Sequence, residues 1–183
     1  MPTINAQSLL LAFDRIGEAA TKHGTRLELL VYGGSALMIA SNFRFATEDV
    51  DIASIGEEWP DRLLSETRSI ARENEWSEDW LNDAVQFHLS SSARKDTDHI
   101  LFGSYPPDSE KPGLAIYIPK PEYMLALKLK AMRFNDPAKG ETETNDVVQL
   151  MRTIGISTAN SAIDVLRQYF PKSAEALKSR NSC

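Results

Sequence analysis

Hydrophobic residues recur along this chain with two different spacings, which predict helices and strands in turn. Apolar residues follow the 3.6-residue period of an amphipathic helix over residues 5–23, and Gly24 follows where a helix would end. The apolar run at 26–32 stops at two glycines, which predicts a buried strand with a sharp turn at its end. A short helix at 34–41 and a second strand at 49–54 are expected next.

The patterning becomes mainly helical toward the C-terminus. A helix is expected over 58–74. The strands expected after it cover residues 84–89, 99–105 and 114–118, and the later helices cover residues 121–134, 141–154 and 158–170. The sequence therefore predicts an α/β fold, in which a mixed β-sheet core flanked by helices (residues 1–119) is followed by a helical C-terminal region (residues 120–183) packed on it as one compact domain.

Composition excludes several classes of protein. The chain has 183 residues, 42% of them hydrophobic and 25% charged, as is ordinary for a globular domain. No apolar run approaches the roughly 18 residues needed to cross a bilayer, and the N-terminus lacks a secretory pattern, so a cytoplasmic protein is expected. Its single cysteine, Cys183, excludes a disulfide framework and a thiolate zinc site. The net charge of −6 means that a nucleic-acid partner would need a local basic patch, which Lys120, Lys130, Arg133 and Lys139 could supply.

Two aspartates separated by one residue are the first candidate chemical group. Asp49 and Asp51 alternate with Val50 and Ile52 in the expected strand, so their carboxylates project from one face, about 6–7 Å apart at the Cα level. Such a pair repels itself unless a cation lies between the two charges, and its hard oxygens suit Mg²⁺ or Mn²⁺. The alternative interpretation is a solvated edge strand.

A glycine turn precedes this pair along the chain, close enough in sequence for the two to form one site. Gly33, Gly34 and Ser35 follow the first strand and begin a helix, so their backbone N–H groups can approach an anion closely. Arg44 and Thr47 lie between the turn and the acidic pair. A metal site beside a phosphate-binding turn predicts chemistry at the α-phosphate of a nucleotide.

A lysine on an apolar helix face is the second candidate. Met124, Lys128 and Met132 fall within one arc of the helix after Pro121, where an ammonium is costly unless a carboxylate or phosphate faces it. The alternative is a lysine whose stem packs while its head reaches water. Asp146, at the edge of the next helix's apolar stripe, could pair with Lys128 or complete a metal site.

With these residues in order, the chain resembles the DNA polymerase β-like minimal nucleotidyltransferases. It is most similar to their AbiEii-like group, which is found as toxins of bacterial toxin–antitoxin and abortive-infection systems. The resemblance covers roughly residues 28–156. Its landmarks are Gly33-Gly34-Ser35-Ala36-Leu37, Arg44, Thr47, Asp49-Val50-Asp51, Trp80-Leu81-Asn82-Asp83, Tyr123 to Ala131, and Glu143 with Asp146 before Gly155-Ile156.

The resemblance implies a nucleotidyltransferase that moves a nucleoside monophosphate from a nucleoside triphosphate to a hydroxyl of an RNA, tRNA included, or of a protein. It further implies a toxin with a cognate antitoxin protein as partner. The implied roles are metal binding for Asp49 and Asp51, triphosphate binding for Gly33, Gly34, Ser35, Arg44 and Thr47, phosphate binding for Lys128, and a metal or base role for Asp146.

One departure from the family favours a second hypothesis. Minimal nucleotidyltransferases usually take a third carboxylate from a neighbouring strand, but residues 114–118 contain no acid. Asp83 or Asp146 could substitute. The alternative is a non-catalytic nucleotidyltransferase-like protein that binds a nucleotide or a partner. Two tryptophans and the three histidines are expected to be structural or exposed, namely Trp76, Trp80, His23, His88 and His99.

Overall fold

The structure is a computed structural model that describes residues 3–41, 44–55, 61–131 and 137–180. The chain divides into two compact units, of which the first holds residues 1–87 and 99–118 and the second holds residues 88–98 and 119–183. The second unit thus begins next to the expected boundary after residue 119, and it also takes in residues 88–98, which the sequence pattern assigns to the core.

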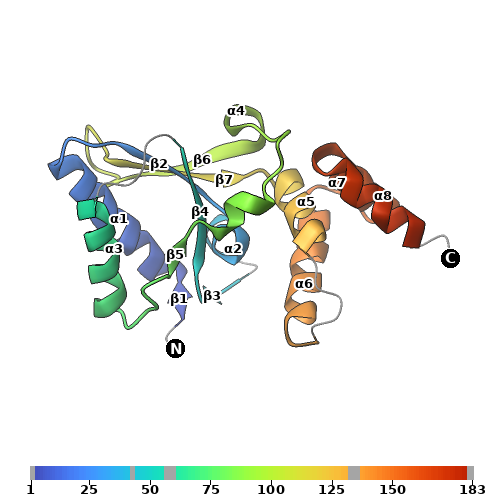
Figure 1. The fold of residues 1–183 in the computed structure, drawn as a ribbon, viewed down its shortest axis with the longest axis horizontal. Coiled ribbons are helices and arrows are strands. Elements are labelled where there is room, and N and C mark those ends of the chain that lie inside the picture. The colour runs from blue at the N-terminus through green and yellow to red at the C-terminus, as the bar shows by residue number, and fades with distance from the viewer. Residues whose placement is uncertain (1–2, 42–43, 56–60, 132–136, 181–183) are drawn as a thin grey trace. The chain divides into compact units, whose positions relative to one another are not determined.

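A five-stranded mixed sheet forms the centre of the first unit (Figure 1). Its strands are β2 (Leu27–Val31), β4 (Val50–Ile55), β5 (Leu81–Asn82), β6 (His99–Tyr105) and β7 (Leu114–Pro119). They lie in the order β5-β4-β2-β7-β6, with β2 parallel to β7, β2 antiparallel to β4, and β4 parallel to β5. A two-stranded antiparallel sheet joins β1 (Ile4–Asn5) to β3 (Ala46–Thr47). The predicted α/β class with a mixed sheet is confirmed.

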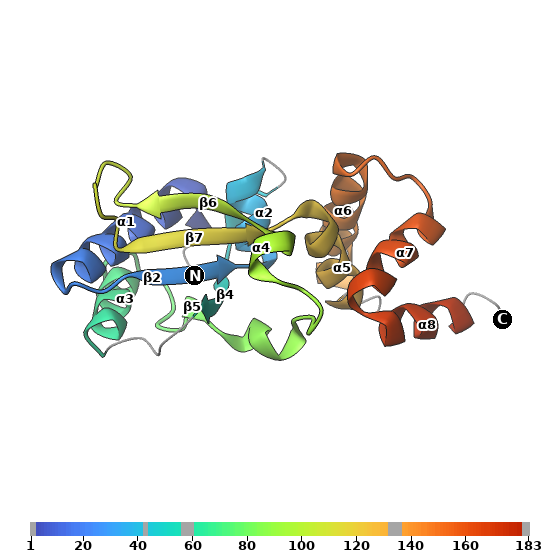
Figure 2. The same ribbon diagram turned by 90° about the horizontal axis from the view of Figure 1, so that it is seen from above.

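Three helices of the first unit lie on one side of this sheet (Figures 1 and 2). They are α1 (Ala6–Lys22), α2 (Gly33–Ala40) and α3 (Asp61–Glu73). Burial alternates along β2, where Leu27, Leu29 and Val31 are buried while Glu28 and Leu30 are half-buried. Burying a side chain of this size contributes about 1.5–3 kcal/mol, so the alternation holds β2 in one register against the helices.

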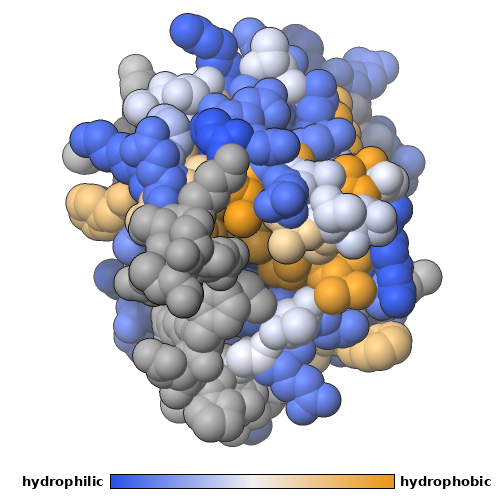
Figure 3. All heavy atoms as spheres, turned by 90° about the vertical axis from the view of Figure 1, so that its right-hand side faces the viewer, coloured by the Kyte–Doolittle hydropathy of each residue, from blue (hydrophilic) through white to orange (hydrophobic). Residues whose placement is uncertain are grey.

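The second unit is mainly helical, as the patterning predicts. Its helices are α4 (Lys95–Asp98), α5 (Pro121–Ala131), α6 (Pro137–Thr153), α7 (Ala159–Tyr169) and α8 (Pro171–Arg180). α5 contacts α6 and α7, and α7 contacts α8. Several apolar side chains of α6, α7 and α8 are only half-buried, and hydrophobic residues gather in one area of the face shown in Figure 3. The second unit therefore leaves part of its apolar surface open.

Hydrogen bonds explain why residues 88–98 belong to the second unit. Ser90 donates its backbone N–H to Tyr123 Oη (3.0 Å) and its hydroxyl to the Tyr169 carbonyl (2.7 Å). Tyr169 Oη donates to Asp98 Oδ1 (2.9 Å), and the Tyr123 and Tyr169 rings lie 4.7 Å apart. Because these bonds join segments far apart in the sequence, local patterning cannot predict them.

The strand predicted over 84–89 is wrong. Residues Ala84–His88 form a 3-10 helix (η1), while the strand lies just before it at β5. Asn82 Oδ1 accepts the Ala84 N–H (3.2 Å) and the Asp83 carbonyl accepts the Gln86 N–H (3.0 Å), so the chain turns immediately after β5. The alternation of apolar and polar residues in this segment imitates a strand, but the hydrogen bonds are local.

The other predicted elements within the described residues are found, with shifts of a few residues at their ends. Residues 58–60 and 132–134 of two predicted helices, with Met132 and Arg133, lie outside the described residues. The pattern did not predict β1, β3, β5, η1, α4 or α8. No helix in the described part of the chain is long and apolar enough to cross a membrane.

Candidate functional site

Backbone hydrogen bonds fasten the glycine turn to the strand that carries the acidic pair. Tyr32, the residue before the turn, donates its N–H to the Asp51 carbonyl (2.9 Å). Its own carbonyl accepts the Ala36 N–H (3.2 Å) and the Ser35 hydroxyl (2.7 Å). Through these bonds, Tyr32 holds the end of β2 and the start of α2 against β4.

Gly33 lies in direct contact with Asp51. Its φ is +64°, which is costly for residues other than glycine, and a Cβ built on it would collide with Asp51 Oδ2. The backbone conformation and the close approach both require glycine here. The Asp51 carboxylate thus lies on the turn, as a metal site beside a phosphate-binding turn would need.

Two further predicted residues, Arg44 and Thr47, lie close to Gly34. A Cβ on Gly34 would lie 2.5 Å from Arg44 Nη1 and 3.3 Å from Thr47 Oγ1. Thr47 is buried, and its hydroxyl donates to the Asp49 carbonyl (3.0 Å), which ties β3 to the start of β4. The guanidinium of Arg44 therefore supplies positive charge at the same turn.

The acidic pair shows the burial that a period-2 strand predicts. Val50 and Ile52 are buried, Asp51 is half-buried, and Asp49 is exposed just before β4 begins. The carboxylates therefore remain accessible to a ligand while the apolar residues between and after them anchor the strand.

The N-terminus of α2 adds an electrostatic contribution. The first N–H groups of a helix have no intrahelical carbonyl to bond, and the helix dipole places partial positive charge there. Ser35 is 1% exposed and its hydroxyl donates to the Tyr32 carbonyl, so its side chain holds the turn in place. Gly33 and Gly34 contribute backbone N–H groups at this helix N-terminus.

The second unit holds the two remaining predicted residues as an ion pair. Lys128 Nζ lies 2.8 Å from Asp146 Oδ2, and the side chains are 14% and 1% exposed. The expectation that an anion faces the Lys128 ammonium is confirmed, and the anion is a carboxylate of the same chain. Of the alternatives for Asp146, the structure contains the pairing with Lys128, and the metal or base role stays a prediction.

The predicted residues thus fall into two sets. The first unit brings together Gly33, Gly34, Ser35, Arg44, Thr47, Asp49 and Asp51, and the second unit brings together Lys128 and Asp146. That the two sets form one pocket stays a prediction.

The third carboxylate that minimal nucleotidyltransferases usually take from a neighbouring strand has no counterpart on β7. β7 carries no acid, and no group of three or more His, Cys, Asp or Glu side chains in the described ranges is arranged to hold a metal ion. Asp83 is exposed beside η1. The residue in register with Asp51 on β5 is Asn82, which the sequence analysis noted only as a landmark. The sequence pattern missed that residues 81–82 form a strand paired with β4, because the alternating residues that follow made 84–89 the predicted strand.

The histidines and tryptophans show structural roles where they are buried. His99 Nε2 and Tyr32 Oη share a hydrogen bond of 2.9 Å, and both side chains are buried. Trp80 is fully buried and donates its Nε1–H to the Thr67 carbonyl (3.1 Å), with its ring 5.1 Å from that of Trp76. These contacts support the expectation that the residues pack rather than bind a ligand.

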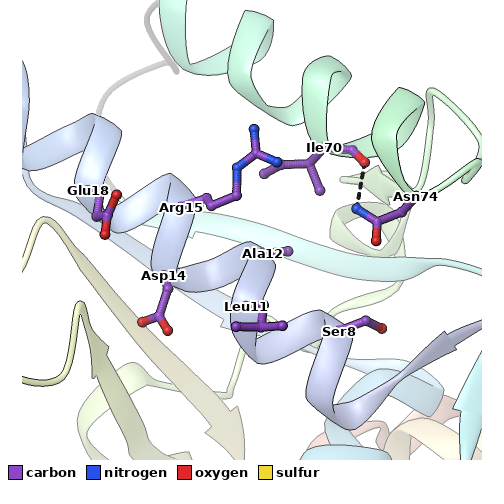
Figure 4. Close-up of a pocket in the computed structure, with 8 residues that line it drawn as sticks. All are labelled: Ser8, Leu11, Ala12, Asp14, Arg15, Glu18, Ile70 and Asn74. Atoms are coloured by element: carbon purple, nitrogen blue, oxygen red, sulfur yellow. Dashed lines mark hydrogen bonds between the residues drawn. The ribbon is translucent and has the colours of Figure 1, made fainter.

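A pocket of about 430 Å³ lies elsewhere in the first unit, between α1 and α3 (Figure 4). Its lining includes Asp14 and Arg15 of α1, Ile70 of α3 and Asn74 just after α3, and none of the predicted site residues. Burial, and secondarily the charges of Glu18 and Asp108, raise the pKa of Asp14. Arg15 is neutralised by Glu66 (2.7 Å) and Glu73 (2.5 Å).

Comparisons of the chain with protein-family models, with curated proteins and with solved structures find no match. The functional interpretation therefore depends on the residues of this chain and their geometry.

Proposed function

We propose that this protein is a Mg²⁺-dependent nucleotidyltransferase that moves a nucleoside monophosphate from a nucleoside triphosphate to a hydroxyl of an RNA, such as tRNA, or of a protein. One observation carries the proposal: the Asp51 carboxylate lies against Gly33 while the Arg44 guanidinium lies against Gly34. The turn therefore brings together a carboxylate, a guanidinium and the N-terminus of α2.

The residues at this turn fit a divalent cation with a phosphate chain. Asp49 and Asp51 offer hard oxygen ligands, and the lack of a Cβ at Gly33 lets the Asp51 carboxylate lie directly against the backbone of the turn. When bound, the cation would neutralise charge developing on the α-phosphate. The N–H groups of Gly33, Gly34 and Ser35 would bind phosphate oxygens, and Arg44 would offset the charge of the departing pyrophosphate.

Lys128 belongs to the proposal as a further phosphate-binding residue. An ammonium has three N–H donors, so the bond to Asp146 does not use all of them, and a remaining donor would bind a phosphate oxygen. In this role Asp146 orients Lys128 within the second unit. As a toxin of a toxin–antitoxin pair, the protein would also bind a cognate antitoxin, a setting supported by the family resemblance alone.

Replacement of Asp49 and Asp51 by Asn tests the enzyme hypothesis. Incorporation of labelled nucleotide into RNA or protein should fall by about 100-fold or more, equivalent to about 2.7 kcal/mol of transition-state stabilisation. Asp79→Asn, at an exposed carboxylate of the same unit, is the matched control and should leave incorporation unchanged. Transfer that survives loss of both carboxylates would refute the assignment.

A non-catalytic binding protein is the second candidate. It is favoured by the sequence of β7 (Leu114–Pro119), which contains no acidic residue where minimal nucleotidyltransferases usually carry a third carboxylate. Calorimetry with each nucleoside triphosphate plus Mg²⁺ separates the two functions, because a binding protein would give heat without product, and an enzyme would give both.

A further inference from the structure

Asn82 lies beside Asp51 in the sheet. β4 and β5 pair in parallel, with Val50 opposite Leu81 and Asp51 opposite Asn82. Residues directly paired on neighbouring strands project their side chains from the same face. The Asn82 amide therefore emerges on the face that carries the Asp51 carboxylate.

One hydrogen bond orients this amide. Asn82 Oδ1 accepts the backbone N–H of Ala84 at 3.2 Å, which directs the oxygen toward the start of η1. The Nδ2 end, with its two N–H donors, points away from that bond because the two atoms are on opposite sides of the amide. Asn82 is half-buried, and within the described ranges its Nδ2 donates to no protein acceptor.

The turn after β5 does not explain why an amide is present. An aspartate could accept the Ala84 N–H equally well, since Asp and Asn both form this side-chain turn. What distinguishes them here is the second atom: asparagine presents N–H donors, while aspartate presents another negative oxygen. An N–H donor suits a phosphate oxygen, and a carboxylate suits a metal ion.

We infer that Asn82 is a third binding residue of this site, and that its Nδ2–H donates to an oxygen of a bound phosphate chain while Asp49 and Asp51 alone hold the cation. This inference rests on the proposed function. It specifies the ligand as a phosphate chain carrying one divalent cation, because two carboxylates and a neutral amide supply a charge of −2 where three carboxylates would supply −3.

Calorimetry on the full chain with two probes tests this assignment. The probes are Mn²⁺ alone and inorganic tripolyphosphate with Mg²⁺. Asn82→Ala should weaken tripolyphosphate binding by about 10-fold, as expected for a hydrogen bond to a charged group, and should change Mn²⁺ affinity by less than about twofold. Asn160→Ala, the same change at an exposed asparagine of α7, should alter neither.

Asn82→Asp keeps an acceptor for the Ala84 N–H, so it tests the inference even if the alanine variant does not fold. It adds a carboxylate beside Asp51, and Mn²⁺ alone should bind about 10-fold more tightly while tripolyphosphate binds more weakly. Unchanged Mn²⁺ affinity in this variant, or unchanged tripolyphosphate affinity in Asn82→Ala, would overturn the inference.

The outcomes also separate this inference from the proposed function. A wild-type protein that binds neither probe would refute both. Binding of both probes with no effect of either Asn82 variant would refute only the role of Asn82. Binding with the expected variant effects, but without nucleotide transfer, would remove the enzyme and keep Asn82 as a phosphate-binding residue of a non-catalytic protein.

Discussion

The two charged regions of this protein differ in how their charges are compensated. In the first unit, Asp49 is exposed and Asp51 half-buried against Gly33, at the positive end of a helix. In the second unit, Lys128 and Asp146 form a 2.8 Å pair with Asp146 almost fully buried. The first arrangement leaves its carboxylates partly exposed to solvent, whereas the second buries its ion pair. Loss of charge should therefore reduce ligand binding in the first unit and stability in the second.

The largest effect on stability is expected from Asp146→Ala. Removing one partner leaves the other as an uncompensated buried charge, which typically costs about 3–5 kcal/mol of unfolding free energy. Urea unfolding measures the loss. Asp51→Ala is the matched change in the first unit and should cost less than about 1 kcal/mol, because the Asp51 side chain is half-buried rather than fully buried. Equal losses in the two variants would contradict the comparison.

A double variant, Lys128→Met with Asp146→Leu, sharpens the same contrast. Replacing both members of a buried ion pair by apolar residues is often neutral, so most of the stability lost in Asp146→Ala should return. Nucleoside triphosphate affinity, measured by calorimetry, should nevertheless fall by about 10-fold because one charged phosphate contact is absent. Unchanged affinity in this folded variant would show that Lys128 has only a structural role.

A medium effect is expected from Gly33→Ala, for which Gly24→Ala is a matched control. Both glycines have nearly the same positive φ, +64° and +65°, but a Cβ meets Asp51 only at Gly33 and meets nothing at Gly24. Each substitution should cost about 1–2 kcal/mol for the left-handed backbone. Gly33→Ala should cost more and should also weaken Mn²⁺ binding. Identical stability and Mn²⁺ affinity in the two variants would contradict the contact with Asp51.

The smallest effect is expected from Asp14→Asn, and it depends on pH. Because the folded state raises the pKa of Asp14 above its ordinary value of 3.8, the folded form binds this proton more tightly than the unfolded form does. Its stabilising contribution is complete below pH 3.8 and is lost as pH rises through the raised pKa. The variant should therefore gain stability over wild type near neutral pH, by less than about 1 kcal/mol, and little near pH 3.

Thermal unfolding at the two pH values measures this difference. Asp79→Asn is the control, because Asp79 is exposed and is not among the charges that raise the pKa of Asp14. A gain for Asp14→Asn that is equal at both pH values would rule out titration of Asp14 as its cause.

The elements that were predicted correctly are those whose burial repeats along the chain. β2 alternates buried and half-buried residues, and α1 begins at Asn5, whose side chain accepts the Ser8 N–H (2.9 Å). Such signals lie within a few residues of one another. At residues 84–88 the alternation of apolar and polar residues predicted a strand, but hydrogen bonds between near neighbours form a 3-10 helix there instead.

The sequence by itself determined the turn at Gly33 and Gly34, the alternation of Asp49 and Asp51 with buried Val50 and Ile52, and the need of Lys128 for an anion. These follow from local geometry, because backbone conformation and helix or strand period act over a few residues. Only the tertiary structure decided which partners those residues meet. It placed Asn82 opposite Asp51 and Asp146 opposite Lys128, since strand register and helix packing depend on the whole set of buried contacts in each unit.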